Sequence, residues 1–295
     1  MNVTSQATRL DQLQPDTVDA FAQALHATRA ALSPSTRALM DRTLTATHAQ
    51  CVREDEHPLG PADRIIADFC DQFVIAVGQT TDDQRQRLRD VLGDTGAYLL
   101  SHALYLTDMH RRLQQLLPGM LSMDFELPID AQVNAVEDNS SMDRLIAEFA
   151  AAAVRADAVD PLTSELVRLR CAQTHRCRLC ASLRVDQALD QGLNEDMVLQ
   201  VANYPESLFS AAQKAALALA DAIILQPLAA DPGLANELAH HFTPEQIAEI
   251  CFDVVKWSQQ KALVALELDA ASWDVPHVLS FDAHGHPVFG TAAYR

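Results

Sequence analysis

Apolar residues return every three or four positions through most of this chain, which is the spacing of one face of an α-helix. One such segment, at residues 34–51, opens on Ser33-Pro34, an N-cap followed by proline at the first helical position. Asp160-Pro161 and Thr243-Pro244 repeat that arrangement. Glycine is scarce, with 9 residues, and aromatic side chains make up only 5%, a balance that favours helices over sheets. The sequence therefore predicts an all-α fold.

The helical pattern has one long interruption, which divides the chain into two helical domains. Residues 119–141 lose the periodicity and end in a polar, turn-rich run, so we expect a linker there. It separates a helical domain at 1–118 from a second one at 142–270. Residues 271–295 differ in composition and are expected to form an extended arm or a small hairpin about His284-Gly285.

An internal repeat relates the two predicted domains. Shifting the chain by 150 residues lays 62–77 over 212–227 and keeps the following helices in register. The same shift places Ala27 and Ala30 opposite Cys177 and Cys180. The first domain is thus expected to be a copy of the fold without cysteine chemistry.

That chemistry is concentrated in the stretch ELVRLRCAQTHRCRLCASLR, residues 165–184. It holds a Cys177-x-x-Cys180 pair and five of the nineteen arginines in a protein with a formal charge of −18. A thiolate is the reactive form of cysteine, and neighbouring arginines or a helix N-terminus lower a thiol pKa. If a helix begins near His175 or Arg176, both cysteines lie on one face of its first turn. The pattern favours a redox dithiol.

A zinc site is the main alternative for this stretch. Cys171, His175, Cys177 and Cys180 have the side chains of zinc ligands. All four fall within ten residues, whereas structural zinc sites usually join two separate segments, and a ring of arginines disfavours a dication. We therefore expect no metal here.

Composition and charge restrict the partners and the compartment. The strong negative charge disfavours nucleic acid and anionic membrane surfaces, since both would be repelled. The opening MNVTSQATRLDQLQPD is polar throughout, and the apolar run at 215–225 is too short to span a bilayer. Six cysteines are too sparse for a disulfide scaffold. We expect a cytoplasmic protein that binds neither nucleic acid nor membrane.

The phrase ELVRLR, with eleven residues between its glutamate and a C-x-x-C, resembles the carboxymuconolactone decarboxylase-like superfamily, and most closely its AhpD-type alkylhydroperoxidases. The resemblance covers residues 142–268. It implies two tandem helical domains of this type, assembly into homo-oligomers, and reduction of hydroperoxides in antioxidant defence. By the same resemblance, Cys180 is the peroxidatic cysteine, Cys177 the resolving one and Glu165 the proton-relay acid. No cofactor is implied beyond the dithiol, which an external dithiol protein would reduce.

One position departs from that family. The histidine usually found four residues after the second cysteine is Arg184 here. Arginine stays protonated and cannot relay a proton, although it can stabilise a thiolate. His175 is a second candidate for tuning the thiols, and Glu165 could instead pair with Arg168 or Arg170. Two other functions stay open: a lactone decarboxylase or hydrolase of the same superfamily, and a catalytically silent redox sensor or binding protein.

Overall fold

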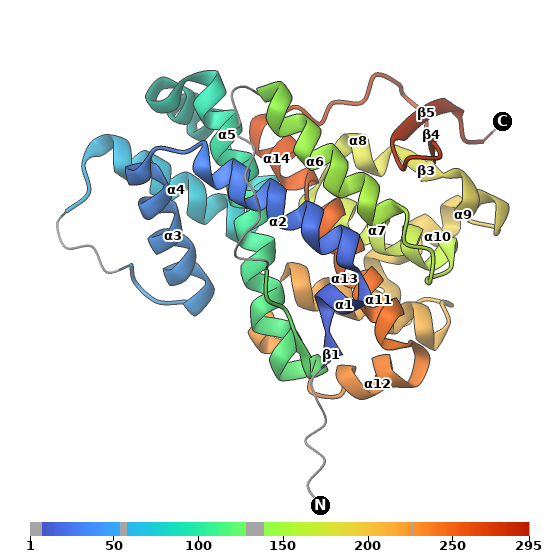
Figure 1. Cartoon of the computed structure of the whole chain (residues 1–295). Coiled ribbons are helices and arrows are strands. Elements are labelled where there is room, and N and C mark those ends of the chain that lie inside the picture. Colours follow the sequence, from blue (N-terminus) through green and yellow to red (C-terminus); the bar gives the residue numbers. More distant parts are fainter. Residues whose placement is uncertain (1–7, 54–57, 128–138, 226, 295) are drawn as a thin grey trace, which may run out of the picture.

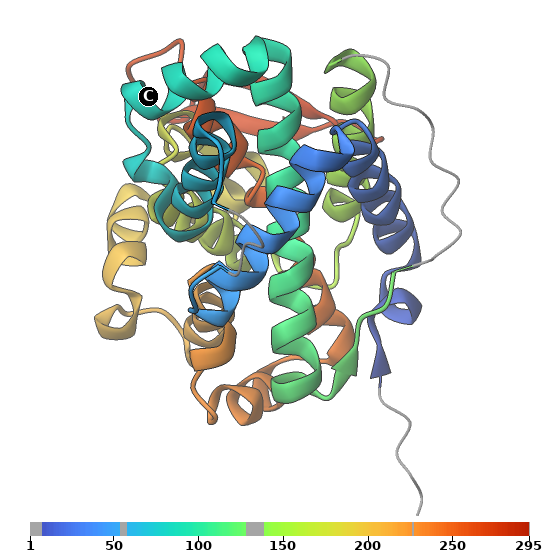
Figure 2. The same ribbon diagram turned by 90° about the vertical axis from the view of Figure 1, so that its left-hand side faces the viewer.

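The computed structural model describes residues 8–53, 58–127, 139–225 and 227–294, and it is built almost entirely of helices, as predicted (Figure 1). The second half of the long helix α5 runs through the middle of the molecule in both views (Figures 1 and 2). The α-helices are α1 (Leu10–Leu13), α2 (Pro15–Ala30), α3 (Pro34–Ala49), α4 (Pro61–Ala76), α5 (Asp82–Leu116), α6 (Asn139–Val154), α7 (Pro161–His175), α8 (Arg178–Ala181), α9 (Asp186–Asp190), α10 (Glu195–Gln200), α11 (Ala211–Ile224), α12 (Leu234–His241), α13 (Pro244–Trp257) and α14 (Gln260–Leu266). Single turns and short strands are η1 (Val77–Gln79), η2 (Leu117–Leu121), η3 (Val201–Glu206), η4 (Pro227–Ala229), β1 (Thr8–Arg9), β2 (Met123–Asp124), β3 (Leu183–Val185), β4 (His277–Phe281) and β5 (Pro287–Ala292).

Several helices begin at residues whose side chains satisfy the first backbone N–H groups. Ser33 accepts a hydrogen bond from the N–H of Thr36 at 3.1 Å, and Asp160 accepts one from the N–H of Thr163 at 2.9 Å. Thr243 forms a reciprocal capping box with Gln246 at the start of α13. Each such cap is worth about 1 kcal/mol of helix stability, so local sequence decides where these helices start.

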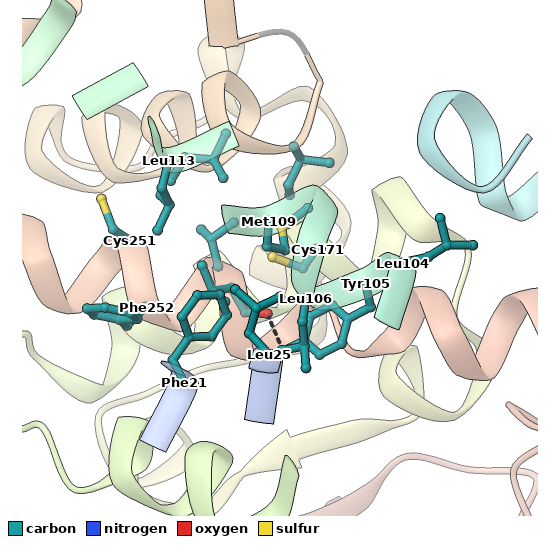
Figure 3. Close-up of a cluster of buried hydrophobic side chains, with 14 of the residues drawn as sticks. Phe21, Leu25, Leu104, Tyr105, Leu106, Met109, Leu113, Cys171, Cys251 and Phe252 are labelled. Carbon is teal, nitrogen blue, oxygen red and sulfur yellow. Dashed lines mark hydrogen bonds between the residues drawn. The ribbon is translucent and has the colours of Figure 1, made fainter. Parts of the chain in front are cut away.

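Both halves of the chain contribute to one continuous core. Phe21 of α2, Met109 of α5, Cys171 of α7 and Phe252 of α13 belong to the same buried cluster (Figure 3). The rings of Phe21 and Phe149 of α6 lie 5.2 Å apart, which joins helices from either side of the predicted linker. Residues 128–138 of that linker lie outside the described residues. The two predicted units therefore share their interior.

The internal repeat is visible in the second part of each half. Helices α4 and α11 begin at residues 61 and 211, and η1 and η4 at 77 and 227, which keeps the shift of 150. Helix α5 bends at Gly93, where φ is 69°, and its two arms match α12 and α13–α14. The hydroxyl of Tyr105 donates to the carbonyl of Val255 at 2.9 Å, and these residues are 150 positions apart. Equivalent turns of α5 and α13 thus meet, as they would on a pseudo-two-fold axis.

The first part of each half follows a different register from the one predicted. Helix α3 matches α7: both begin at a capping residue followed by proline, and both end at a residue with positive φ, Gln50 at 53° and Arg176 at 58°. Helix α2 instead packs on α6. The prediction that Ala27 and Ala30 stand opposite the two cysteines is wrong, because Cys51 follows α3 as Cys177 follows α7.

The C-terminal residues fold back as a hairpin. Strands β4 and β5 pair antiparallel, and β4 also pairs parallel with β3, so the order is β3-β4-β5. Gly285 turns the hairpin with φ 86°, and a Cβ there would lie 2.6 Å from the carbonyl oxygen of Ala151 in α6. Arg155 adds a hydrogen bond to the carbonyl of His284 at 2.8 Å. These contacts hold the hairpin against α6.

Among the described helices, none is by itself long and apolar enough to cross a bilayer; one pair bent by 80°, Glu195–Glu206 with Ala211–Ile224, passes that test on length and composition.

A buried carboxylate links helices of both halves at the centre of the molecule. Asp108 accepts hydrogen bonds from Arg112 at 2.7 Å and Lys261 at 2.6 Å, and it pairs with His48 at 2.9 Å. Burial alone would raise the pKa of Asp108, but the two cations and the hydrogen bond from His48 hold it well below its usual value. The carboxylate is therefore ionised and compensates charge that would otherwise be buried unpaired.

We expect Asp108→Asn to lower the free energy of unfolding by about 3 kcal/mol or more, because Arg112 and Lys261 stay buried without a counter-charge. Asp83→Asn is the matched control: Asp83 pairs with Arg87 at the same spacing on the same helix but in solvent. It should change stability by about 0.5 kcal/mol or less. Urea denaturation of the two variants measures both values, and equal effects would contradict a structural role for the buried charge.

Candidate active site

Cys177 and Cys180 lie at a sharp turn between two helices. Helix α7 ends at His175, Arg176 adopts the left-handed conformation, and Cys177 becomes the N-cap of α8. The sulfur of Cys177 accepts a hydrogen bond from the backbone N–H of Cys180 at 3.3 Å. The new helix thus begins at Arg178, slightly later than predicted, and it lasts only four residues. Both cysteines are free thiols and almost completely buried, with 1% and 7% of their surfaces exposed.

The turn is anchored by Asp269, which follows α14. Its carboxylate accepts hydrogen bonds from the backbone N–H of Arg178 at 2.9 Å and from the Arg178 side chain at 2.7 Å. The N–H of Leu179 donates to the Asp269 carbonyl at 2.8 Å. Burial opposes ionisation here, but the hydrogen bonds from Arg178 keep the pKa of Asp269 below its usual value. An ionised Asp269 therefore fixes the backbone that carries the two cysteines.

Glu165 and Arg168 form a buried ion pair beside the dithiol. The guanidinium donates to both carboxylate oxygens, at 2.5 and 2.7 Å. It also donates to the carbonyl oxygens of Cys180 at 2.7 Å and Leu183 at 2.6 Å. Glu165 was expected either to relay a proton or to pair with a nearby arginine, and the structure shows the ion pair with Arg168. The carboxylate is held as an acceptor and positions the guanidinium against the cysteine loop.

The two thiols differ in their readiness to ionise. Hydrogen bonds from the Cys180 thiol and from its backbone N–H lower the pKa of Cys177, although burial opposes this. Donating that bond, together with burial, holds the pKa of Cys180 well above its ordinary value. The positive charge of Arg168 favours ionisation of both. The first proton lost from the pair therefore leaves a negative charge on Cys177, although the resemblance assigns the peroxidatic role to Cys180.

Arg184 and His175, expected to tune the thiolate, are occupied elsewhere. Arg184 lies in β3 because α8 has already ended, and it donates to Glu195 at 2.8 and 3.1 Å. His175 faces the hydroxyl of Ser258 at 3.3 Å. Burial and the charges of the Asp108 cluster hold the pKa of His175 well below its usual value. The structure corrects this expectation: the guanidinium that acts on both thiols belongs to Arg168.

Cys180 borders a cavity of about 420 Å³. Most of the lining is apolar and comes from α6, α13, α14 and the C-terminal hairpin, including Ala147, Trp257, Leu263 and Phe289. The hairpin thus forms one wall of the dithiol cavity, a contribution that its sequence did not reveal. Such a lining suits a largely apolar molecule.

A second cavity of about 300 Å³ adjoins the first, and several charged side chains line it. Lys256, Trp257, Phe281 and Gly285 line both cavities and so form the boundary between them. The other residues that line the second cavity include Glu165, Arg168, Glu249 and Asp253. The two acids and Lys256 recur at helical spacing, at positions 249, 253 and 256, among mostly apolar residues of α13, and this spacing is visible in the sequence.

The zinc alternative is not supported by the geometry. In the described part of the chain, no three His, Cys, Asp or Glu side chains are grouped so that they could hold a metal ion. Cys171 packs in the hydrophobic core instead.

Comparisons with known proteins place this geometry in context. The model of the carboxymuconolactone decarboxylase family matches residues 141–222, which contain the cysteine pair. Two uncharacterized proteins of Mycobacterium tuberculosis, MT2376 and Rv2313c, are each 31% identical to this chain over 236 residues, covering 79% of this chain and 83% of theirs. The uncharacterized protein YnjA of Escherichia coli is 31% identical over 93 residues, covering 31% of this chain and 51% of YnjA. No solved structure gives a significant match.

The coupling of the two thiols predicts opposite effects of removing either one. Cys180→Ala deletes the largest cause that lowers the pKa of Cys177, so that pKa should rise. Cys177→Ala should lower the pKa of Cys180, because the thiol no longer donates to a sulfur. Titration of thiolate ultraviolet absorbance in the two variants and in the parent protein measures these shifts. Two pKa values that stay where they are in the parent would contradict the coupling.

Proposed function

Because this chain belongs to the carboxymuconolactone decarboxylase family, we propose that it reduces an organic hydroperoxide with the dithiol of Cys177 and Cys180. The family includes alkylhydroperoxidases and decarboxylases. The main observation in favour of peroxide reduction is a pair of free thiols, joined by a hydrogen bond, at the edge of a mostly apolar cavity. A cavity of about 420 Å³ suits a substrate with a substantial apolar group rather than hydrogen peroxide alone.

Cys180 is the proposed point of attack because its side chain lines the cavity. The hydrogen bond from the Cys180 thiol lowers the pKa of Cys177, so when the pair loses its first proton the negative charge lies on Cys177 and Cys180 donates to it. Transfer of the Cys180 proton to Cys177 creates a thiolate on Cys180 where the substrate binds. The thiolate attacks the terminal oxygen, the O–O bond breaks, and the products are a sulfenic acid on Cys180 and an alkoxide that takes up one proton.

Cys177 completes the oxidation. Its sulfur attacks the sulfur of Cys180, the S–O bond breaks, and hydroxide leaves with the Cys177 proton as water. The sum is one hydroperoxide and two thiols converted to one alcohol, one water and one disulfide. An external dithiol protein then reduces the disulfide by exchange and returns two protons. The ion pair of Glu165 and Arg168 positions the Cys180 and Leu183 carbonyls and thereby the loop.

The proposal is tested by adding one equivalent of cumene hydroperoxide to the reduced protein and locating disulfides by mass spectrometry. We expect a disulfide between Cys177 and Cys180, and a rate of peroxide consumption reduced by at least about 10³-fold in Cys180→Ser, since the attacking sulfur is lost. Cys177→Ser should stop at a sulfenic acid on Cys180. Cys51→Ser is the matched control, because Cys51 occupies the equivalent position after α3 and is exposed. It should react as the parent protein does.

Other outcomes point to the alternatives. Thiols that survive the peroxide unchanged would overturn the proposal. Lactone-converting activity that persists in Cys180→Ser would support the decarboxylase or hydrolase alternative. A disulfide that forms once, without turnover in the presence of a reducing dithiol protein such as thioredoxin, would support a redox sensor.

A further inference from the structure

Breaking the O–O bond leaves an alkoxide that must be protonated, and the site residues that the sequence indicated are engaged in other contacts. Arg184 is bound to Glu195 and stays protonated at all ordinary pH values. Glu165 is held by both arms of Arg168, and His175 faces Ser258. A proton donor therefore has to be sought among the other side chains that line the dithiol cavity.

Lys256 is a buried titratable side chain in that lining. It has 5% of its surface exposed, and its ammonium lies 3.8 Å from the centre of the Trp257 ring and 4.7 Å from that of Phe281. Tyr98 also borders the cavity, but its hydroxyl donates to Asp143 and burial raises its pKa further above neutrality. Lys256 thus offers a proton from a site held mainly by aromatic rings, and among the described residues its ammonium forms no ion pair at contact distance.

We propose that Lys256 is the general acid that protonates the leaving alkoxide when Cys180 attacks a hydroperoxide, an inference that rests on the proposed function. Both residues line the cavity proposed for the substrate, so one molecule bound there can contact both side chains. The proton moves from the lysine nitrogen to the alkoxide oxygen as the O–O bond breaks. Lysine is left neutral and alcohol is released.

The electrostatic surroundings suit this exchange. Burial and the charge of Arg168 lower the pKa of Lys256 to about 7, while Asp253 and Glu165 favour its protonated form. A donor of this pKa is protonated in part near neutral pH and gives up its proton far more readily than an ordinary lysine. Trp257 and Phe281 contribute no titratable charge from their side of the amine.

The second cavity, on the other side of Lys256, provides a route for the proton to return. Asp253 and Glu249 lie one turn apart on the same face of α13 and line that cavity together with Lys256. Burial raises the pKa of Asp253 to about 6, and burial together with the charge of Asp253 raises that of Glu249 to about 7. One oxygen of Asp253 is buried without a hydrogen-bond partner. The two acids therefore gain and lose protons in the same pH range as Lys256.

The experiment compares two oxidants that differ in their leaving groups. Cumene hydroperoxide releases an alkoxide, which needs a proton, whereas peracetic acid releases a carboxylate, which does not. In single-turnover oxidation of the reduced dithiol we expect Lys256→Met to slow the reaction with cumene hydroperoxide by about 10²-fold or more. Its rate with peracetic acid should stay within about threefold of the parent. Lys214→Met, on the exposed start of α11, is the control and should alter neither rate.

The pH dependence of the unaltered protein gives a second test that requires no variant to fold. Both rate constants depend in the same way on ionisation of the thiols, so this dependence cancels in their ratio once the ionisation of the peracid is corrected for. The ratio of the hydroperoxide rate to the peracid rate should fall above about pH 7, where Lys256 loses its proton, and should be constant below that pH. Lys256→Arg keeps a cation that does not deprotonate, so its ratio should be low and independent of pH.

The outcomes separate this inference from the function on which it rests. If the parent protein oxidises with neither reagent, the peroxidase proposal itself fails. If the parent reacts but Lys256→Met slows both oxidants equally, or the ratio does not vary with pH in the parent, Lys256 is not the acid. In that case the hydroperoxide chemistry of the dithiol stands without it.

Discussion

The guanidinium of Arg168 is the contact on which the rest of the site depends. With 1% of its surface exposed, it pairs with Glu165, donates to the carbonyl oxygens of Cys180 and Leu183, and lies 5.5 Å from the centre of the Trp257 ring. One buried cation thereby joins α7 to the loop of the cysteines, to the strand that receives the C-terminal hairpin, and to α13. A buried charge is tolerated only when it is paired and hydrogen-bonded, so these elements have to be in place together.

The pseudo-two-fold arrangement shows how the two halves differ at this site. Counted from the prolines that open the two helices, the position in α3 that corresponds to Arg168 is Asp41, which pairs with Arg29 of α2 at 2.7 Å. The side chain at this position is negative instead of positive, and it pairs with a residue of α2 and not with the loop that follows α3. Cys51 keeps the place of Cys177, but it is exposed and has no second cysteine three residues later. The histidines retain their equivalence: His48 contacts Asp108, and His175 contacts Ser258, 150 residues further on.

The hairpin and α13 together divide the space around the dithiol into two environments. On one side Cys180 faces apolar side chains, where a thiolate is costly and an organic substrate displaces water readily. On the other side Glu165, Glu249 and Asp253 gather with Arg168 around Lys256. A largely apolar cavity beside Cys180 and a cavity with several charged side chains are thus separated by one lysine and two aromatic rings.

Local sequence by itself determined the all-α fold, the helix starts at Ser33, Asp160 and Thr243, and the presence of a dithiol after α7, because helical periodicity and capping act within a few residues. The family, too, was readable from Glu165 and the cysteine spacing. Tertiary structure alone decided which charges act on the sulfurs. Arg184 and Arg168 are equally basic in the sequence, yet the early end of α8 turns one toward Glu195 while α7 buries the other beneath the cysteines. The substrate cavity was likewise beyond prediction, because its walls come from α6, α13, α14 and the hairpin, whose distances along the chain carry no information about their contact.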